Sequence, residues 1–138
     1  MNVEPPVLVV EDDEDDFFLT ERTLRRFTVG RILHVESGRS AIDYLRGQGP
    51  YANRAAHPLP GIVFLDLKMD QLNGHDVLAA IREHPPKPLP KIFVLTGSNE
   101  PKDRELVKSS GVAAGYIVKP LSTDHLTCLI YTSPSPRD

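Results

Sequence analysis

Polar side chains follow four separate apolar runs of this chain. Glu11 and Asp12 come directly after VLVV, Asp66 after IVFL, Thr96 after IFVL and Lys119 after YIV. Open α/β folds place their chemistry at the carboxyl ends of parallel strands, so residues in these positions can meet. Carboxylates suit a bound Mg²⁺, and a hydroxyl and an ammonium suit phosphoryl oxygens. The pattern therefore indicates a site for Mg²⁺-assisted phosphoryl transfer.

The apolar runs have the length and β-branched composition of buried strands in a parallel sheet. The sequence predicts five strands, at Val7–Val10, Arg31–Glu36, Ile62–Leu65, Lys91–Leu95 and Tyr116–Val118. Helices alternate with them: one after the acidic run Glu11–Asp16, then Ser40–Arg46, Gly74–His84, Asn99–Ser110 and a last one from about Ser122. This alternation favours a doubly wound α/β domain of the flavodoxin-like type, with strand order 2-1-3-4-5.

Several local features follow from the residue types. The first helix is expected to bury an apolar face made of Phe17, Phe18, Leu24 and Phe27. Asn99 is a predicted helix cap and Gly111 a predicted helix stop. The segment Gly47–Gly61 contains three glycines and three prolines, so we expect a surface loop without an element of its own.

Two groups of polar residues are expected to lie apart from the site. We interpret three acids of the first helix as a solvated run: Glu14, Asp15 and Asp16. The histidines have no metal-ligand spacing, and we expect them at the surface or in loops: His34, His57, His75, His84 and His125.

The predicted strand order places Asp12 and Asp66 on neighbouring strands, about 5 Å apart in the pairing direction. Carboxylates this close repel one another by several kcal/mol and need a compensating cation at neutral pH. Mg²⁺ suits a site with few carboxylates because it keeps waters and accepts a phosphate oxygen. Thr96 lies one strand beyond Asp66, and Lys119 lies two strands away, within reach of a long side chain.

Composition limits the classes of protein that fit. The 138 residues suit one domain, and a net charge of −3 argues against electrostatic binding of nucleic acid or a membrane surface. The single cysteine, Cys128, has no internal partner, and the amino terminus MNVEPP lacks the features of a secretion signal. No apolar stretch approaches the roughly 18 residues of a membrane span. We therefore expect a cytoplasmic protein.

Four segments, VLVVED, FLDLKMDQLNG, VLTGS and GYIVKP, resemble the receiver domains of two-component response regulators, the CheY-like family. The resemblance runs from about Val7 to Leu126, with the motifs in the family's order, so we assign residues 1–126 to a receiver domain. It implies a stand-alone response regulator that accepts a phosphoryl group from a sensor histidine kinase and signals by contact with an unidentified protein. Homodimerisation stays open.

The resemblance implies a role for each site residue. Asp66 is similar to the phosphoacceptor, which also contacts Mg²⁺, and Asp12 to the direct metal ligand. Glu11 would contact the metal through water, and the backbone carbonyl of Lys68 would supply a further ligand.

The same resemblance implies the groups that hold the phosphoryl oxygens, which are Thr96 and Lys119. Tyr116 matches the aromatic switch residue, which turns inward when Thr96 moves toward the phosphoryl group.

The chain also departs from the family. Asp70 stands where the family usually has proline, and the Gly47–Gly61 loop resembles that of the subgroup serving phytochrome-type kinases. After Leu126, the Ser-Pro-Ser-Pro segment cannot continue an amphipathic helix, so we expect a truncated last helix and an atypical tail at residues 127–138. From about Cys128 onward the amino-acid sequence resembles translated sequencing-adapter sequence, and we expect this segment not to be native to the protein.

Three alternatives are set against this interpretation. A Mg²⁺-dependent phosphatase with a strand-end aspartate wants a second acid two residues on, where this chain has Lys68. A nucleotide- or flavin-binding module needs a glycine-rich first loop, whereas this one is acidic. A receiver cut from a larger response regulator or a hybrid histidine kinase is the third alternative.

Overall fold

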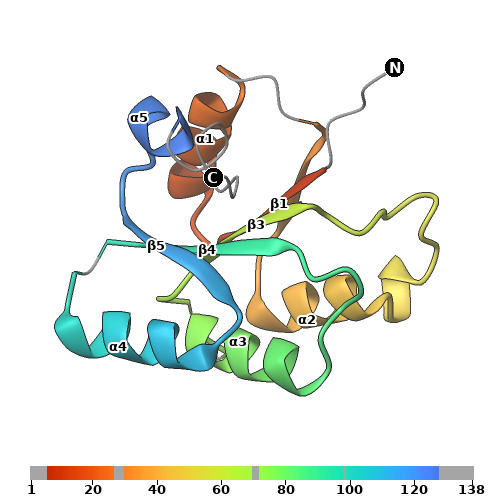
Figure 1. The fold of residues 1–138 in the computed structure, drawn as a ribbon. Helices are drawn as coiled ribbons and strands as arrows, with labels where there is room; N and C mark the ends of the chain where they lie inside the picture. The colour runs from red at the N-terminus through yellow and green to blue at the C-terminus, as the bar shows by residue number, and fades with distance from the viewer. Residues whose placement is uncertain (1–5, 27–29, 70–71, 98, 128–138) are drawn as a thin grey trace, which may run out of the picture.

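Five strands form one parallel sheet in the order β2-β1-β3-β4-β5 (Figure 1). This computed structural model describes residues 6–26, 30–69, 72–97 and 99–127. The strands are β1 (Val7–Val10), β2 (Ile32–Val35), β3 (Ile62–Asp66), β4 (Lys91–Thr96) and β5 (Ala113–Val118). The predicted order is confirmed. β1 pairs in parallel with both β2 and β3, so β2 is added on one side of β1 and the later strands on the other.

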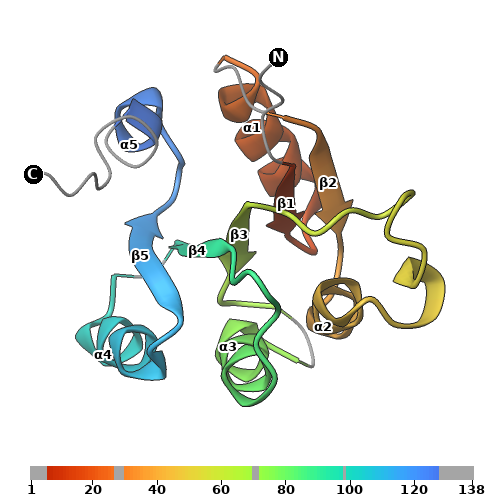
Figure 2. The ribbon, with the colours of Figure 1, turned by 45° about the vertical axis from the view of Figure 1, so that its right-hand side comes forward.

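Helices cover both faces of the sheet, as Figures 1 and 2 show. One face carries α2 (Gly38–Arg46), α3 (Gly74–Glu83) and α4 (Pro101–Ser110), and the other carries α1 (Glu14–Leu24) and α5 (Thr123–Leu126). Among the described residues, no helix is long and apolar enough to cross a membrane. The predicted end of the last helix and the tail after Thr127 lie outside the described residues.

Alternate side chains of the central strands enter two separate cores. Leu8 and Val10 of β1 pack with α2, α3 and α4 in the first core, whereas Val7 and Val9 pack with α1 and α5 in the second core. All four side chains are buried, which explains why β1 is a continuous apolar run instead of an alternating one. The carboxyl end of this rigid strand is where Glu11 and Asp12 emerge.

Helix α3 begins directly against the end of β3. Asn73 caps it, and its side chain and that of Asp76 exchange hydrogen bonds with each other's backbone N–H groups. A Cβ atom at Gly74 would lie 2.7 Å from both the carbonyl oxygen of Asp66 and the Cα of Leu67. Only glycine allows this approach, so Gly74 fixes α3 against the backbone that carries Asp66.

The start of β5 differs from the prediction, because the strand begins at Ala113 and Tyr116 lies inside it. The small residues before Tyr116 gave no strand signal. The reason for one of them is packing, since a Cβ at Gly115 would lie 3.0 Å from the ring of Phe93 on β4.

The predicted apolar face of α1 is wrong for Phe18, which is 58% exposed. Phe17 packs against the second core and Leu24 is fully buried there. These two residues are seven apart and share one helix face, whereas Phe18 is turned about 100° away. Phe27 lies outside the described residues.

The predicted cap of α4 needs correction. Asn99 does not cap α4: Glu100 occupies that position without a side-chain cap, and the Asn99 side chain accepts a hydrogen bond from Arg104. Pro101 at the first helical position has no N–H to satisfy. Gly111 does end the helix, in the left-handed conformation with φ 78°.

The Gly47–Gly61 segment contains a short 3₁₀ helix, η1 (Gly49–Tyr51), although no element was predicted there. The ring centroids of Tyr44 and Tyr51 lie 4.9 Å apart, and His57 packs edge-on against Tyr51 at 5.3 Å. The Arg54 guanidinium donates to the carbonyls of Leu45 and His57. The loop is therefore a packed structure, built from aromatic contacts between residues that no local pattern links.

Candidate functional site

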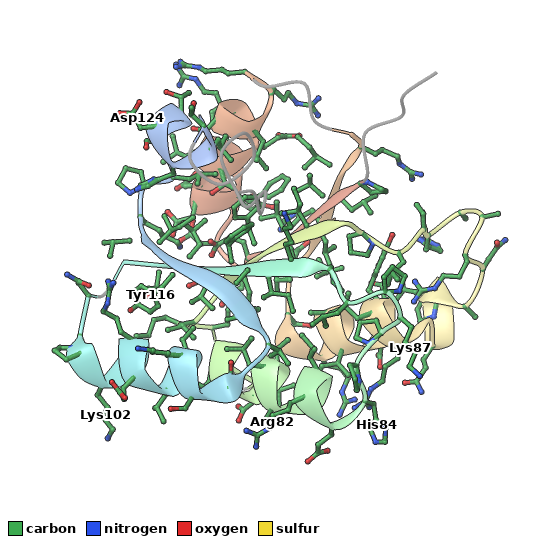
Figure 3. The ribbon with its side chains drawn as sticks, viewed as in Figure 1. Arg82, His84, Lys87, Lys102, Tyr116 and Asp124 are labelled. Atoms are coloured by element: carbon green, nitrogen blue, oxygen red, sulfur yellow. The ribbon has the colours of Figure 1, made fainter. Side chains whose placement is uncertain are left out.

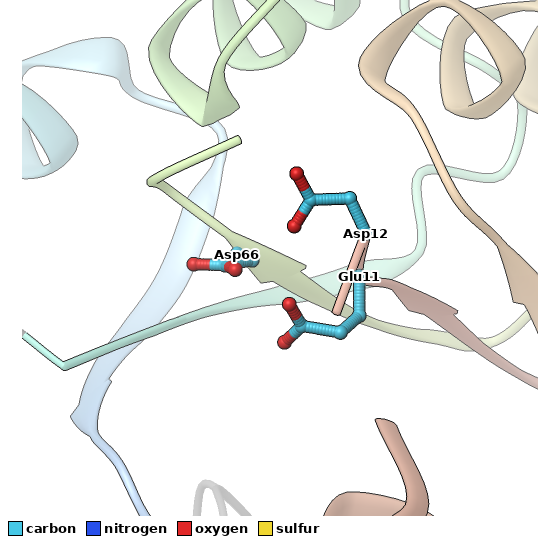
Figure 4. A group of neighbouring side chains, drawn as sticks. All are labelled: Glu11, Asp12 and Asp66. Carbon is cyan, nitrogen blue, oxygen red and sulfur yellow. The ribbon is translucent and has the colours of Figure 1, made fainter. Parts of the chain in front are cut away.

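Three carboxylates converge at the carboxyl edge of the sheet (Figure 4). Glu11 and Asp12 follow β1, and Asp66 ends β3, so parallel pairing of these strands brings them together. One oxygen from each side chain lies within 4.8 Å of the other two. Glu11 is 2% exposed and Asp66 4%, whereas Asp12 is exposed to solvent. The cluster therefore consists of two buried carboxylates and one, that of Asp12, which is open to solvent.

Lys119 reaches this cluster from the end of β5. Its Nζ lies 2.9 Å from Oε1 of Glu11 and 3.4 Å from Oδ2 of Asp66. A third carboxylate, Oδ2 of Asp16 on α1, lies 2.7 Å from the same nitrogen. The interpretation of Asp16 as a merely solvated acid was therefore wrong, because its position in the first turn of α1 turns it toward the site.

Burial is the main cause that raises the pKa of Glu11 to about 7. The hydrogen bond with Asp66 and the negative charge of Asp66 raise this pKa further, and Lys119 only partly opposes the rise. Burial alone would lower the pKa of Lys119, but its bonds to Asp16 and Glu11 raise that pKa above its ordinary value. Lys119 therefore stays charged, and Glu11 gains and loses its proton close to neutral pH. One ammonium is too little positive charge for all of these carboxylates.

The donor set fits a hard divalent cation. Glu11, Asp12 and Asp66 offer oxygen atoms only, and these atoms lie within 4.8 Å of one another. Mg²⁺ accepts one or two carboxylates and completes its shell with water, and exposed Asp12 leaves a route for such an ion. The residues present could therefore hold Mg²⁺.

Thr96 ends β4, between the strands that carry Asp66 and Lys119. Its side chain is fully buried, and its carbonyl oxygen accepts a hydrogen bond of 2.7 Å from the Lys119 backbone N–H. Thr96 is paired with Val118 in the sheet register, so the carboxyl ends of β4 and β5 stay level. The structure thus brings Thr96 to the same edge as the acidic cluster.

Lys68 lies just after Asp66. Its backbone N–H donates to Oδ1 of Asp66 at 3.1 Å, which fixes the carboxylate from the loop side. Its ammonium points away and lies 3.4 Å from Oδ2 of Asp103 on α4. The metal contact assigned to its backbone carbonyl stays a prediction.

Asp103 forms a second charged cluster that the sequence analysis missed. It is buried in the first turn of α4, and its Oδ1 lies 3.2 Å from Nε2 of His75 on α3. The hydrogen bond to His75, helped by the charge of Lys68 and opposed by burial, holds the pKa of Asp103 below its usual value. This cluster ties α4 to both α3 and the loop after Asp66.

Tyr116 lies on β5 and packs, half-buried, against the first core. The guanidinium carbon of Arg104 on α4 lies 4.9 Å from its ring centroid. Burial is the main cause that raises the pKa of Tyr116. The ring is therefore held by α4 and β5, and Figure 3 labels its position.

Three histidines are not the plain surface residues that were expected. His34 is half-buried on β2, His75 pairs with Asp103, and His125 accepts from the backbone N–H of Ser122 at the start of α5. None of these contacts has a sequence signal of its own, because each joins residues through the fold or through an irregular cap.

Comparison with known proteins identifies the class. The family model of the response regulator receiver domain matches residues 7–131. The probable methanogenesis regulatory protein FilR2 of Methanothrix harundinacea is 34% identical over 122 residues, which cover 87% of this chain and 75% of that protein. Response regulator Rcp1 of Synechocystis is 33% identical over 100 residues, covering 70% of this chain and 66% of that protein.

Solved structures agree with the sequence matches. The phosphorylated cyanobacterial phytochrome response regulator RcpA superposes with a TM-score of 0.81 at 26% identity, covering 98% of this chain and all of that one. The bacteriophytochrome response regulator AtBRR gives 0.79 at 28% identity, with 94% and 92% covered. This chain therefore belongs to the response regulator receiver domain family, and its homologues include phytochrome-associated members.

Proposed function

We propose that this chain is a stand-alone response regulator that accepts a phosphoryl group from a sensor histidine kinase onto Asp66, in a Mg²⁺-dependent reaction. The observation that carries the proposal is the convergence of the Asp66 carboxylate with two further acids and the ammonium of Lys119. The phosphatase alternative lacks its second acid, because Lys68 stands there and its side chain turns toward α4.

Glu11, Asp12 and Asp66 would hold the Mg²⁺ ion, with the backbone carbonyl of Lys68 as a further ligand. The bound cation supplies charge neutralisation for the phosphoryl oxygens as negative charge moves onto them. The burial of Glu11 and Asp66 keeps water away from one side of the site, and the exposed Asp12 side leaves room for the donor.

The Asp66 carboxylate would attack the phosphorus atom in line, forming a new O–P bond while the N–P bond to the donor histidine breaks. Lys119 lies 3.4 Å from Oδ2 of Asp66 and would move its ammonium onto a phosphoryl oxygen. The buried hydroxyl of Thr96 would hold a second oxygen. The hydrogen bond from Lys68 N–H to Oδ1 orients the carboxylate for this reaction.

The output would be a shift between two conformations of the face formed by α4 and β5. Movement of Thr96 toward the phosphoryl group would let Tyr116 turn inward, and its present contact with Arg104 would then change. The downstream partner would be a protein that binds this face in one of the two conformations. A second copy of the chain would be one candidate.

We propose a phytochrome-like sensor kinase in the cytoplasm as the donor. This rests on relatives whose names connect them with phytochromes, RcpA and AtBRR among them, and on the Gly47–Gly61 loop. A second candidate is a receiver within a longer protein. It is favoured by a probable cyclic di-GMP phosphodiesterase of Vibrio cholerae, 30% identical over 127 residues that make up 26% of that protein.

Acetyl phosphate and Mg²⁺ test the proposal. Intact-protein mass spectrometry should detect one added phosphoryl group on the wild-type chain, none on Asp66→Asn, and one on the control Asp43→Asn, whose carboxylate lies on α2. Addition of the group to Asp66→Asn at the wild-type level would refute the assignment. Omission of Mg²⁺ should prevent the reaction in the wild type as well.

A further inference from the structure

The ring of His34 joins three separate segments of the chain. His34 lies on β2, and its Nε2 is 2.9 Å from the backbone carbonyl oxygen of Glu11. The ring also stacks on Phe17 in the first turn of α1, with centroids 3.7 Å apart and planes 3° from parallel. One half-buried side chain thus contacts both ends of the loop that carries the acids after β1.

Chemistry fixes the direction of the hydrogen bond. A carbonyl oxygen can only accept, so Nε2 of His34 must carry the proton and donate it. The backbone N–H of Glu11 meanwhile donates to the carbonyl of Val35 at 3.1 Å. Both backbone groups of Glu11 are therefore bound to β2, which fixes the direction in which its side chain leaves the backbone.

The stack on Phe17 extends this control to α1. Asp16 precedes Phe17 in the first turn and contacts Lys119, so the orientation of that turn decides where the Asp16 carboxylate lies. The Asp13 side chain caps the helix and accepts from Asp16 N–H, which makes the turn a rigid unit. A displacement of Phe17 would move both groups together.

We propose that His34 is a positioning residue of the metal site, whose Nε2–H bond to the Glu11 carbonyl holds the Glu11 and Asp12 carboxylates in the arrangement that binds Mg²⁺. The inference rests on the proposed function, because it concerns the same three acids. Groups that orient metal ligands contribute to metal affinity through geometry, and their loss typically weakens binding about tenfold or more.

A packing role alone would have a different signature, and three substitutions separate the two. His34→Phe keeps a ring to stack on Phe17 but has no donor. His34→Gln places an amide N–H close to the position of Nε2 but loses the stack. His34→Leu is a second donor-free variant, for use if a phenyl ring disturbs folding. His57→Phe serves as a control, because its ring packs in the Gly47–Gly61 loop.

The measurement is a titration of the full chain with Mn²⁺, followed by electron paramagnetic resonance of the free ion and competition with Mg²⁺. Thermal unfolding in EDTA accompanies each variant. We expect His34→Phe and His34→Leu to bind both ions roughly tenfold more weakly, and His34→Gln and His57→Phe to bind within about twofold of the wild type.

Wild-type affinity in His34→Phe would overturn the inference and leave the proposed function intact. An equal loss in His34→Gln and His34→Phe would overturn it too, because restoring an N–H donor at this position would then not restore affinity. If the wild-type chain bound neither ion, the proposed function itself would fail and this inference with it.

Discussion

The Nζ atom of Lys119 lies 2.7 Å from Oδ2 of Asp16, closer than its contacts with Glu11 and Asp66. Asp16 is thus a third acid that competes for the ammonium. The Asp16 side chain is 41% exposed, so the pair is of the kind that stabilises by only about 0.2–1 kcal/mol. Its importance would lie in where it holds Lys119 before any phosphoryl group arrives.

Asp16→Asn should therefore raise the rate of phosphorylation by acetyl phosphate. Release of Lys119 from the ion pair makes it available to the phosphoryl oxygens, and the energy of an exposed pair corresponds to an increase of roughly 1.5- to 5-fold. The rate is measured by mass spectrometry at fixed Mg²⁺. Asp15→Asn is a matched control, with the same charge change one residue earlier on the exposed side of α1. Equal phosphorylation rates in Asp16→Asn and Asp15→Asn would contradict the prediction, because the change in net charge alone would then explain the increase.

Lys119→Met should destabilise the metal-free protein and increase its response to Mg²⁺. The substitution removes the positive charge closest to Glu11 and Asp66. Loss of one partner from a buried ion pair costs about 3–5 kcal/mol, and we expect about 1–3 kcal/mol because Glu11 can take up a proton. Urea unfolding in EDTA and in saturating Mg²⁺ measures both effects.

The exposed lysine Lys102 on α4 provides the control, as Lys102→Met makes the same chemical change away from the acids. Mg²⁺ should stabilise Lys119→Met by more than it stabilises Lys102→Met or the wild type. Equal stabilisation of all three would mean that Lys119 does not act as the counter-ion of the site.

The Asp103 cluster should make stability depend on pH. Its hydrogen bond to His75 lowers the pKa of Asp103 in the folded state, so its contribution is present above the ordinary carboxyl value and is lost as pH falls through the lowered pKa. The difference in unfolding free energy between wild type and Asp103→Asn should be constant above about pH 5 and shrink toward about pH 3.

Glu105→Gln, an exposed carboxylate on the same helix, should lack this pH dependence. A constant difference between wild type and Asp103→Asn over the whole pH range would contradict the assignment, because the lost contact would then not involve the ionised carboxylate.

Much of the fold could be predicted, because a parallel sheet buried on both faces requires continuous apolar strands. Val7–Val10 is the clearest case, since all four residues enter one core or the other. The start of β5 could not be predicted, because its first residues are small for a tertiary reason, the closeness of Gly115 to Phe93. The exposed position of Phe18 was predictable from helical geometry and was missed.

The positions of Asp12, Asp66, Thr96 and Lys119 were predictable because strand ends in a parallel sheet meet at one edge. The contacts of Asp16, His34 and Asp103 were not, since each depends on the direction in which a side chain leaves a helix or strand and on a partner many residues away. Strand order alone does not carry that information. Asp70, which stands where the family usually has proline, lies outside the described part of the chain.

The aromatic packing of Tyr44, Tyr51 and His57 precedes β3, whereas Asp66 closes that strand at its other end. The length of β3 thus separates the Gly47–Gly61 loop from the carboxylates of Glu11, Asp12 and Asp66. Insertions or exchanges in this loop are accordingly expected to leave the Glu11, Asp12 and Asp66 carboxylates in place.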